Sequence, residues 1–372
     1  MTKKLLSFNH SKSEFLVMGS RSARKKIKNE LNKNPIILCG EKMRETNSLK
    51  YLGDYLGFDL ETSVYQTIVK RVGIVKQTTI EIRAVIEDTR ADKLGPISLA
   101  FDIWEQAILP MLLLNSETWM MISKKSLNIL DNLFHNFCQK IFQVGSECPK
   151  ASYYWESGTH KFSTQILQRK LVFVHHLENL PPEALGRQVL DIQVEKQVGL
   201  YKELEEHLAS MGALNLRDLT KWQMKRKVRS YINALSRREQ LEEIKRYKKL
   251  DHSELSSEPF KRKSYLSSLS LENARMRFRI ASSFVQSVRT NFSRKYRQTS
   301  LSCPACNDTR PTGSTNSSEA DIPEPIRDSQ IHIVSCLAYS DLRGEQFDPK
   351  NDHMLAEYFR KVVQRRIENG QD

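Results

Sequence analysis

Hydrophobic residues recur at helical spacing over most of this chain. The first long stripe consists of Val64, Ile68, Val72, Val75, Thr79, Ile82 and Ile86. Residues three or four positions apart share one face of a helix, so this stripe predicts a single long amphipathic helix. The next stripe consists of Ile97, Phe101, Trp104, Ile108 and Met111. It predicts a second buried helix, which Pro110 is expected to kink because proline lacks a backbone N–H group.

Helical patterns also fill the middle of the chain. Residues 125–144 carry another apolar stripe, and residues 148–194 are mainly helical with a break at the Pro-Pro pair at 181–182. His175 and His176 are adjacent in the second of these regions, so they point about 100° apart on a helix. Such a pair does not easily share one metal ion, and we interpret both histidines as ordinary helix residues.

The last long stripe, at residues 219–250, is accompanied by many basic residues. Its apolar seam consists of Val228, Tyr231, Ile232, Leu235, Leu241, Ile244 and Tyr247. From Lys221 to Lys249 the chain holds eleven Lys and Arg residues against three Glu residues. The seam predicts that this helix packs against the rest of the protein, while its positive face suits phosphate groups. The candidate nucleic-acid contacts are Lys225, Arg226, Lys227 and Arg229, and a solvated helix face is the alternative interpretation.

The residues before the first long helix alternate short apolar segments with turn residues. Residues 13–18 and 36–39 each predict a short strand. Residues 48–58 hold two apolar and aromatic segments on either side of Gly53, which predicts a strand-turn-strand unit with glycine in the turn. The N-terminal part is therefore expected to contain the strands of an otherwise helical protein.

A predicted helix at residues 270–296 interleaves basic with aromatic residues. The basic residues are Arg275, Arg279, Arg289, Arg294 and Lys295, and the aromatic residues are Phe278, Phe284, Phe292 and Tyr296. Bases stack on aromatic rings while guanidinium groups contact phosphate, so this helix is a second candidate nucleic-acid surface. Some of the aromatic residues are expected to face the core instead.

Charge and cysteine content narrow the class of protein. The 372 residues include 58 Lys and Arg against 44 Asp and Glu, a net charge of +14 that favours polyanionic partners. No stretch is typical of a signal peptide or a membrane span, which predicts an intracellular location, nuclear or cytoplasmic. Six cysteines are too few for a disulfide scaffold in a chain of this length, so paired cysteines are interpreted first as metal ligands. Cys138 lies within an apolar stripe and is expected to be a buried structural thiol.

Two pairs of potential metal ligands lie near the C-terminus. Cys303 and Cys306 form a C-x2-C motif, and His332 and Cys336 form an H-x3-C motif. Two thiolates on one tight turn and a His/Cys pair one helical turn apart suit tetrahedral zinc, and four protein ligands make such a site structural. The intervening residues 307–330 are rich in Ser and Pro and are expected to be a disordered insertion. The alternative is that both cysteines of the first motif are free thiols on a loop.

Several short motifs occur in an order that resembles a known family. They read KYLG at 50–53, ILP at 108–110, SETW at 116–119, LENARMRFRI at 271–280, CPAC at 303–306 and DSQIHIVSC at 328–336. In this order they resemble the C-terminal part of non-LTR (LINE-type) retrotransposon reverse transcriptases, over residues 9–366. Two features depart from the family pattern. Ile331 stands where an acidic residue is usual, and the gap between the two ligand pairs is longer.

The resemblance implies a mainly α fold in four consecutive parts. They are an α+β palm remnant at residues 1–60, a helical thumb-like region at 61–195, a basic helical connector at 196–258, and a C-terminal helix with a CCHC zinc-knuckle-like module at 259–372. It also implies that the chain begins downstream of the catalytic palm hairpin and without the endonuclease. Reverse transcriptases hold two metal ions with a paired-Asp hairpin, and no Asp-Asp pair occurs in these 372 residues. We therefore expect no catalytic residues and no polymerisation.

The expected function is the binding of RNA or DNA, either a retroelement transcript or a target site, with structural zinc as the cofactor. The alternative is a zinc-stabilised helical adaptor whose partner is a protein. The salt dependence of binding distinguishes the two, because phosphate contacts weaken steeply with salt and an apolar protein interface does not.

Overall fold

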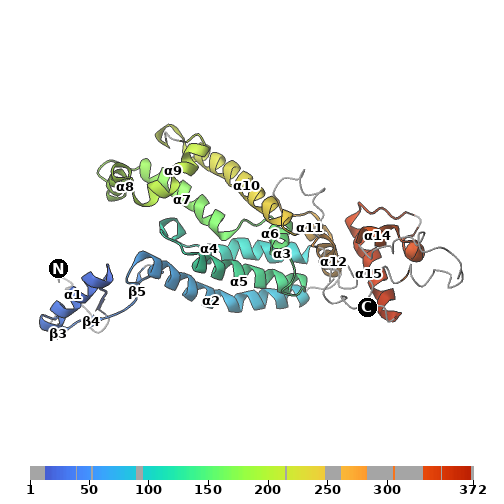
Figure 1. Cartoon of the computed structure of the whole chain (residues 1–372), viewed down its shortest axis with the longest axis horizontal. Helices are drawn as coiled ribbons and strands as arrows, with labels where there is room; N and C mark the ends of the chain where they lie inside the picture. The colour runs from blue at the N-terminus through green and yellow to red at the C-terminus, as the bar shows by residue number, and fades with distance from the viewer. Residues whose placement is uncertain are drawn as a thin grey trace, which may run out of the picture. The chain divides into compact units, whose positions relative to one another are not determined.

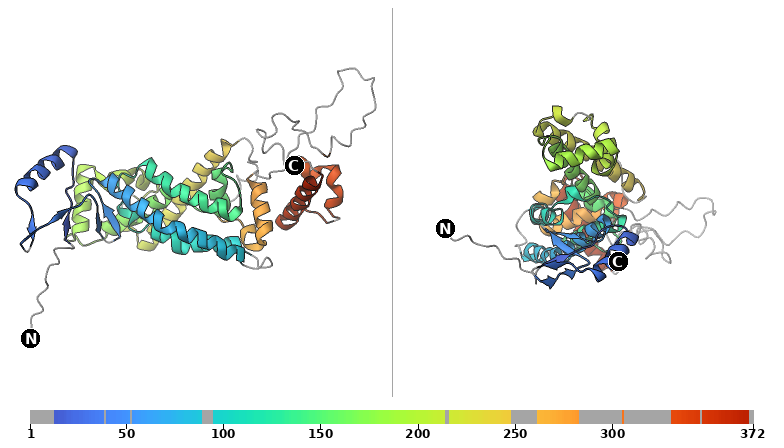
Figure 2. Two further views of the ribbon diagram at one scale, coloured as in Figure 1. Left: turned by 90° about the horizontal axis from the view of Figure 1, so that it is seen from below. Right: turned by 90° about the vertical axis from the view of Figure 1, so that its left-hand side faces the viewer.

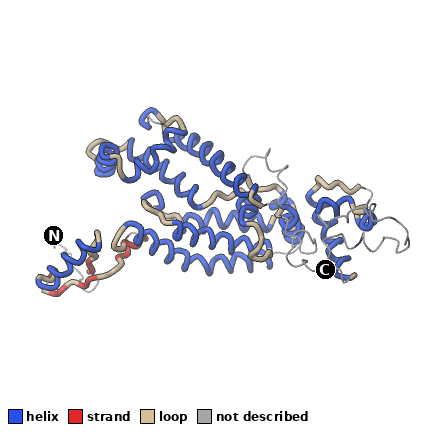
Figure 3. Tube along the Cα trace, viewed as in Figure 1, coloured by secondary structure: helices blue, strands red, loops and turns tan. Residues whose placement is uncertain are grey.

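The computed structural model of the protein describes residues 13–38, 40–51, 53–88, 95–213, 216–247, 261–282, 305, 330–344 and 346–369. Helices make up most of these residues, which confirms the mainly α prediction (Figure 1). Within the same ranges, the strands are short and confined to the N-terminal part (Figure 3). Among the described helices, none combines the length and the apolar composition that a membrane span requires.

The chain forms two compact units, each assembled from three separated stretches. Unit 1 consists of Met1–Ile80, Glu105–Phe134 and Lys161–Leu235. Unit 2 consists of Glu81–Trp104, His135–His160 and Ser236–Asp372. The four consecutive parts expected from the sequence stay a prediction.

In the part of unit 1 that the structure describes, six short strands form three separate two-stranded sheets. The strands are β1 (Glu14–Phe15), β2 (Ile37–Leu38), β3 (Glu41–Lys42), β4 (Arg44–Glu45), β5 (Leu49–Tyr51) and β6 (Asp54–Leu56). β1 pairs with β4 in parallel, whereas β2 pairs with β3 and β5 with β6 in antiparallel fashion. Gly53 has a φ of +89° in the β5–β6 turn, a conformation that favours glycine, so the predicted strand-turn-strand unit is confirmed. Helix α1 (Arg21–Lys33) is capped by the Ser20 side chain.

The first long stripe of the sequence forms one helix, α2 (Leu60–Asp88), as predicted. All seven residues of that stripe are buried. Helix α5 (Lys124–Phe142) runs beside α2, as both views of the ribbon show (Figure 1, Figure 2). At their N-terminal ends, within unit 1, the Lys125 ammonium lies 4.6 Å from the centroid of the Tyr65 ring.

The second stripe forms three consecutive helical segments rather than one kinked helix. They are α3 (Pro96–Ile103), the π-helix η2 (Trp104–Ile108) and α4 (Leu109–Leu112). The disturbance expected at Pro110 thus takes the form of a π-helix just before it. A π-turn holds more residues than an α-turn, so the buried face shifts along the chain. Met111 is consequently 42% exposed, contrary to the prediction, and Leu112 occupies the interior position.

A buried arginine on α2 fixes the β5–β6 turn and the segment after α4. Arg71 is 5% exposed, and burial lowers its pKa while the Asp54 carboxylate, 2.7 Å away, opposes that shift. Its guanidinium also donates to the carbonyl oxygens of Gly53 (3.1 Å), Leu112 (3.3 Å) and Leu114 (2.5 Å). This arginine node, defined as Arg71 with these four partners, joins the end of the KYLG motif to the residues between ILP and SETW.

Residues 283–296 of the helix predicted at 270–296 lie outside the described residues. The remaining helices include those predicted at residues 148–194 and 219–250 and the start of the one predicted at 270–296. They are α6 (Lys150–Ser157), α7 (Phe162–Glu178), α8 (Leu185–Lys196), α9 (Gly199–Ser210), α10 (Lys221–Lys245), α11 (Tyr265–Ser268), α12 (Leu271–Ala281), α14 (Gln330–Ser335) and α15 (Asp352–Glu368), with the short 3₁₀ segments η3 (Ser116–Thr118), η4 (Leu216–Asp218) and η5 (Leu337–Leu342). The predicted break at residues 181–182 separates α7 from α8.

Each unit has its own apolar core. In unit 1, α7, α9 and α10 share one cluster, which includes Leu171, Leu204 and Val228. In unit 2, the Phe142 and Phe278 rings stack 3.7 Å apart at an angle of 7°. Cys138 is fully buried in unit 2, which confirms that prediction. The C-terminal segment of unit 2 has a further cluster, formed mainly by α12, α14, η5 and α15.

Candidate nucleic-acid interface

Helix α10 begins with a reciprocal cap that fixes where its basic residues lie. The Thr220 hydroxyl accepts a hydrogen bond from the Gln223 backbone N–H (3.3 Å), and the Gln223 side-chain oxygen accepts one from the Thr220 N–H (2.8 Å). This T-x-x-Q pattern is a capping box, which satisfies two backbone donors at the start of a helix. Further along, Met224, Val228 and Ile232 are buried in the apolar cluster of unit 1 and hold α10 in place.

A polar contact between α9 and α10 adds to this apolar anchoring. The Tyr231 hydroxyl on α10 lies 2.8 Å from Nδ1 of His207 on α9. Burial lowers the pKa of His207, which favours the neutral ring in this hydrogen bond. The seam of α10 is therefore fixed by both apolar packing and a partly buried hydrogen bond.

The opposite side of α10 presents an exposed basic face, which we define as Trp222, Lys225, Arg226 and Arg229. Residues three, four and seven positions apart share one side of a helix. The Arg226 guanidinium lies over the Trp222 ring, 5.4 Å from its centroid, and Trp222 is 66% exposed. Within the ranges that the structure describes, no residue forms an ion pair with the three cations. They are thus available to phosphate groups.

The structure modifies the predicted contact set on α10 at two positions. Lys227 is half-buried, and its ammonium lies 3.4 Å from the carbonyl oxygens of Met211 and Gly212. It therefore lies beside the exposed basic face rather than on it. Trp222 was missed by the sequence analysis, although an aromatic residue outside the apolar seam of a basic helix is a usable signal.

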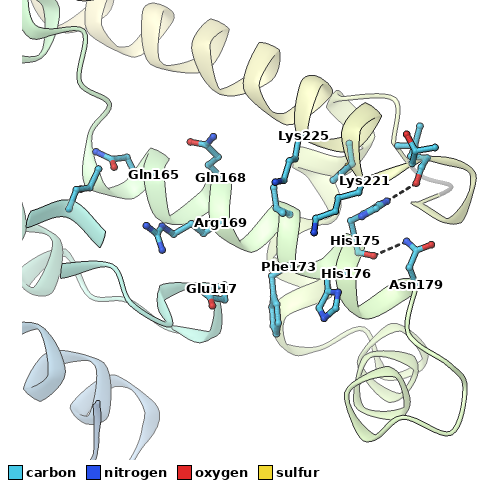
Figure 4. A pocket seen from close by; sticks show the side chains of 15 residues that line it. Glu117, Gln165, Gln168, Arg169, Phe173, His175, His176, Asn179, Lys221 and Lys225 are labelled. Atoms are coloured by element: carbon cyan, nitrogen blue, oxygen red, sulfur yellow. Dashed lines mark hydrogen bonds between the residues drawn. The ribbon is translucent and has the colours of Figure 1, made fainter. Parts of the chain in front are cut away.

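A groove of about 810 Å³ lies between α7 and α10 in unit 1 (Figure 4). Its polar and aromatic lining includes Gln168, Arg169, Phe173 and His176 from α7, Lys221 and Lys225 from α10, and Glu117 from η3. Figure 4 shows both lysine side chains extending from α10 toward α7. Three cations and one carboxylate give the groove a net positive charge.

Hydrogen bonds with backbone carbonyl oxygens fix Arg169 and His175, two residues of α7 that line this groove. The Arg169 guanidinium donates to the Leu113 carbonyl oxygen (2.9 Å). Burial lowers the pKa of Arg169, and the charge of Glu117 opposes that shift. At the other end, Nε2 of His175 lies 2.7 Å from the Leu219 carbonyl oxygen, which can only accept, so Nε2 carries the proton. This bond ties α7 to the residues that precede α10. His175 is therefore structural, as predicted.

The basic residues of the second candidate surface have different placements. Arg275 on α12 is 2% exposed; its guanidinium donates to the Ile141 carbonyl oxygen (2.9 Å) and pairs with Glu87 (3.4 Å). Arg279 is half-buried and donates to the Gln143 carbonyl oxygen (3.1 Å). Because Arg275 lies in the interior, the structure does not support the predicted nucleic-acid contact at this residue. The other three predicted contacts, Arg289, Arg294 and Lys295, lie outside the described residues.

The predicted zinc ligands are described only in part. Cys303 and Cys306 lie outside the described residues, as does the side chain of His332. Cys336 is 1% exposed and belongs to the C-terminal apolar cluster. Ala305, between the two cysteines of the C-x2-C motif, packs against the same cluster. Among the described residues alone, no group of three or more His, Cys, Asp or Glu side chains is arranged to hold a metal ion.

Comparison with protein-family models, with curated proteins and with solved structures found no match to this chain.

Proposed function

We propose that the protein binds RNA or DNA through the exposed basic face of α10, as a reverse-transcriptase-like protein of the non-LTR retrotransposon type. The main observation that supports this proposal is that Lys225, Arg226 and Arg229 share one exposed side of a helix with Trp222. Such a side offers cations to phosphate groups and a ring to bases. The net charge of +14 favours the same class of partner.

We further propose that this chain does not polymerise nucleic acid. Phosphoryl transfer by a polymerase needs paired carboxylates that hold two metal ions. These 372 residues contain no Asp-Asp pair, and the motifs that carry the family resemblance lie outside the catalytic hairpin. The proposed activity is therefore binding alone.

A structural zinc is the cofactor that we propose for the C-terminal segment. Cys303, Cys306, His332 and Cys336 would hold it, and it would contribute stability rather than chemistry. Two observations support the proposal. The ligand spacing suits zinc, and Ala305 of the C-x2-C motif packs on the cluster that contains Cys336. Cysteine thiols and a histidine are also the donor set that zinc prefers.

The salt dependence of binding tests the proposed function. We expect the affinity for a DNA duplex to fall steeply with salt, because each neutralised phosphate releases counterions. The triple variant Lys225→Gln, Arg226→Gln, Arg229→Gln should reduce the slope of log affinity against log salt by about 0.9 for each phosphate that is no longer neutralised, or roughly 2.7 in all. Fluorescence anisotropy with labelled RNA and DNA measures both quantities.

A matched triple variant controls for the change in net charge itself. The control variant Lys70→Gln, Lys76→Gln, Lys196→Gln also removes three positive charges, but from exposed positions on α2 and α8. We expect it to bind almost as the parent does. Equal effects of the two triple variants, or an affinity for nucleic acid that is insensitive to salt, would contradict the proposal. The second result, combined with salt-insensitive binding of a protein partner, would favour the helical adaptor.

A further inference from the structure

We infer that the groove between α7 and α10 holds one unstacked nucleotide of a single strand, with its phosphate at Lys221 and Lys225 and its base on the rings of Phe173 and His176. This inference rests on the proposed function and adds to it a preference for single-stranded over duplex nucleic acid. It assigns roles to four groove residues, of which only Lys225 belongs to the exposed basic face.

The phosphate position follows from the cations at the α10 side of the groove. Lys221 and Lys225 are one helical turn apart, both are exposed, and both extend toward α7 (Figure 4). Within the part of the chain that the structure describes, neither lysine has an ion-pair partner. Arg169 adds a third positive charge from the α7 side, while Glu117 contributes the single negative one. The groove therefore attracts an anion, and two ammonium groups suit the non-bridging oxygens of one phosphate.

The base position follows from two rings on α7. Phe173 and His176 are three residues apart on one side of the helix, with ring centroids 6.5 Å apart and planes tilted by 36°. At that separation and tilt neither ring covers the other, so both keep a face open. Phe173 is half-buried against the apolar cluster of unit 1, which fixes its orientation, whereas His176 is exposed. A fixed ring beside an accessible one is a suitable platform for a planar base.

The dimensions of the groove explain the preference for a single strand. A volume of about 810 Å³ lies within the range of small-molecule sites, which extends to about 1,000 Å³. A stacked base in a duplex offers only its edges, so it cannot place a face on the two rings. A base in a single strand can turn out of the stack and do so. Gln168, which also lines the groove, adds an amide that can both donate to and accept from a base edge.

A set of abasic oligonucleotides tests this inference. The probe is a short single-stranded oligodeoxynucleotide, together with versions that lack one base at each position in turn and with the matching duplex. We expect one abasic position to weaken binding by the parent protein by about 5-fold to 150-fold, the range that base–aromatic stacking supplies. His176→Ala should weaken binding of the intact strand by a similar factor and remove the sensitivity to that position. Binding of the duplex should not change.

Two further variants make the test specific. Phe173→Leu keeps an apolar side chain against the cluster but removes a ring, so it should reproduce the effect of His176→Ala if the protein remains folded. His353→Ala, at an exposed position on α15, is the matched control and should bind as the parent does.

The outcomes separate this inference from the proposed function. Salt-dependent binding with no abasic position more costly than the others, or an equal effect of His176→Ala on single strand and duplex, would overturn the inference alone. The exposed basic face of α10 would then remain the binding surface. Absence of any binding to single strand and duplex would overturn both.

Discussion

The buried guanidinium of Arg71 forms its ion pair with the Asp54 carboxylate, 2.7 Å away. Asp54→Ala would leave a positive charge in the interior without this counter-charge. Because three carbonyl oxygens would still accept from the guanidinium, we expect unfolding free energy to fall by about 3 kcal/mol, the lower end for a broken buried pair. Urea unfolding followed by circular dichroism measures the change.

The control is an exposed ion pair on another helix. Glu30 and Lys33 on α1 are both exposed and lie 3.8 Å apart. Glu30→Ala should change stability by no more than about 0.5 kcal/mol. If Asp54→Ala costs as little as Glu30→Ala, the arginine node does not stabilise the fold as its geometry indicates.

Single residues also mark where sequence-based prediction stops. The buried stripe of α2 could be predicted from the sequence because burial follows helical periodicity. Arg71 interrupts that stripe, and a charged residue there looks like a break in the pattern until its four distant partners are known. Arg275 shows the converse, because interleaving with aromatics predicted exposure and the structure buries its guanidinium. In both cases the deciding contacts come from residues far away in the sequence.

At the scale of elements, the start of α2 depends on a titratable cap. Asp59 precedes the helix, and its Oδ1 accepts from the Thr62 backbone N–H at 2.7 Å. That hydrogen bond is the main cause that lowers the pKa of Asp59 below its ordinary value. A lowered carboxyl pKa means that the stabilisation is present above the pKa of the unfolded chain and is lost as pH falls through the pKa of the folded state.

This cap gives a pH-dependent prediction. At neutral pH, Asp59→Ala should lower the free energy of unfolding by about 1 kcal/mol, as other helix caps do. As pH falls below about 4 and through the lowered pKa of the folded state, the parent loses the charged acceptor, so the difference between the two proteins should shrink. Asp59→Asn retains a capping oxygen without a charge, and its stability should change less across that range. A constant difference between parent and Asp59→Ala at all pH values would show that the cap is not titrating.

The other elements show which features the sequence pattern could predict. Helix positions followed from periodicity, and the β5–β6 turn followed from glycine between two apolar segments. The π-helix before Pro110 did not, because the pattern of five residues at Trp104–Ile108 reads the same in α or π geometry. The sequence pattern did not predict the groove between α7 and α10 either. Its lysines and rings are between 45 and 52 residues apart in the sequence, and helical periodicity does not show which side of one helix packs against another.

At the scale of the whole molecule, the division into two units is the feature that the sequence pattern predicts least. Each unit consists of three stretches that are separated in the sequence, so composition averaged along consecutive residues does not predict the division into units. The family resemblance rests on short motifs and stays a proposal. The arginine node links one of those motifs to the segment between two others, since Gly53 and the residues after ILP bond the same guanidinium.

Zinc content is the prediction that concerns the C-terminal segment as a whole. Protein purified under reducing conditions should contain one zinc per chain, measured by plasma mass spectrometry. Cys306→Ser should lose most of it, because a four-ligand site loses a thiolate. Cys39→Ser, outside both motifs, is the matched control and should retain the metal. Zinc-free parent protein, or equal zinc in both variants, would contradict the proposed site.

The arginine node also bears on the order in which the molecule folds. Its bonds span 17, 18, 41 and 43 residues of sequence. The helix and the hairpin that carry Arg71 and Gly53 form from local contacts, whereas the longer spans require loop closure first. Contacts that form after the rate-limiting barrier slow unfolding without hastening folding. We therefore expect the node to lengthen the lifetime of the native state more than it speeds folding.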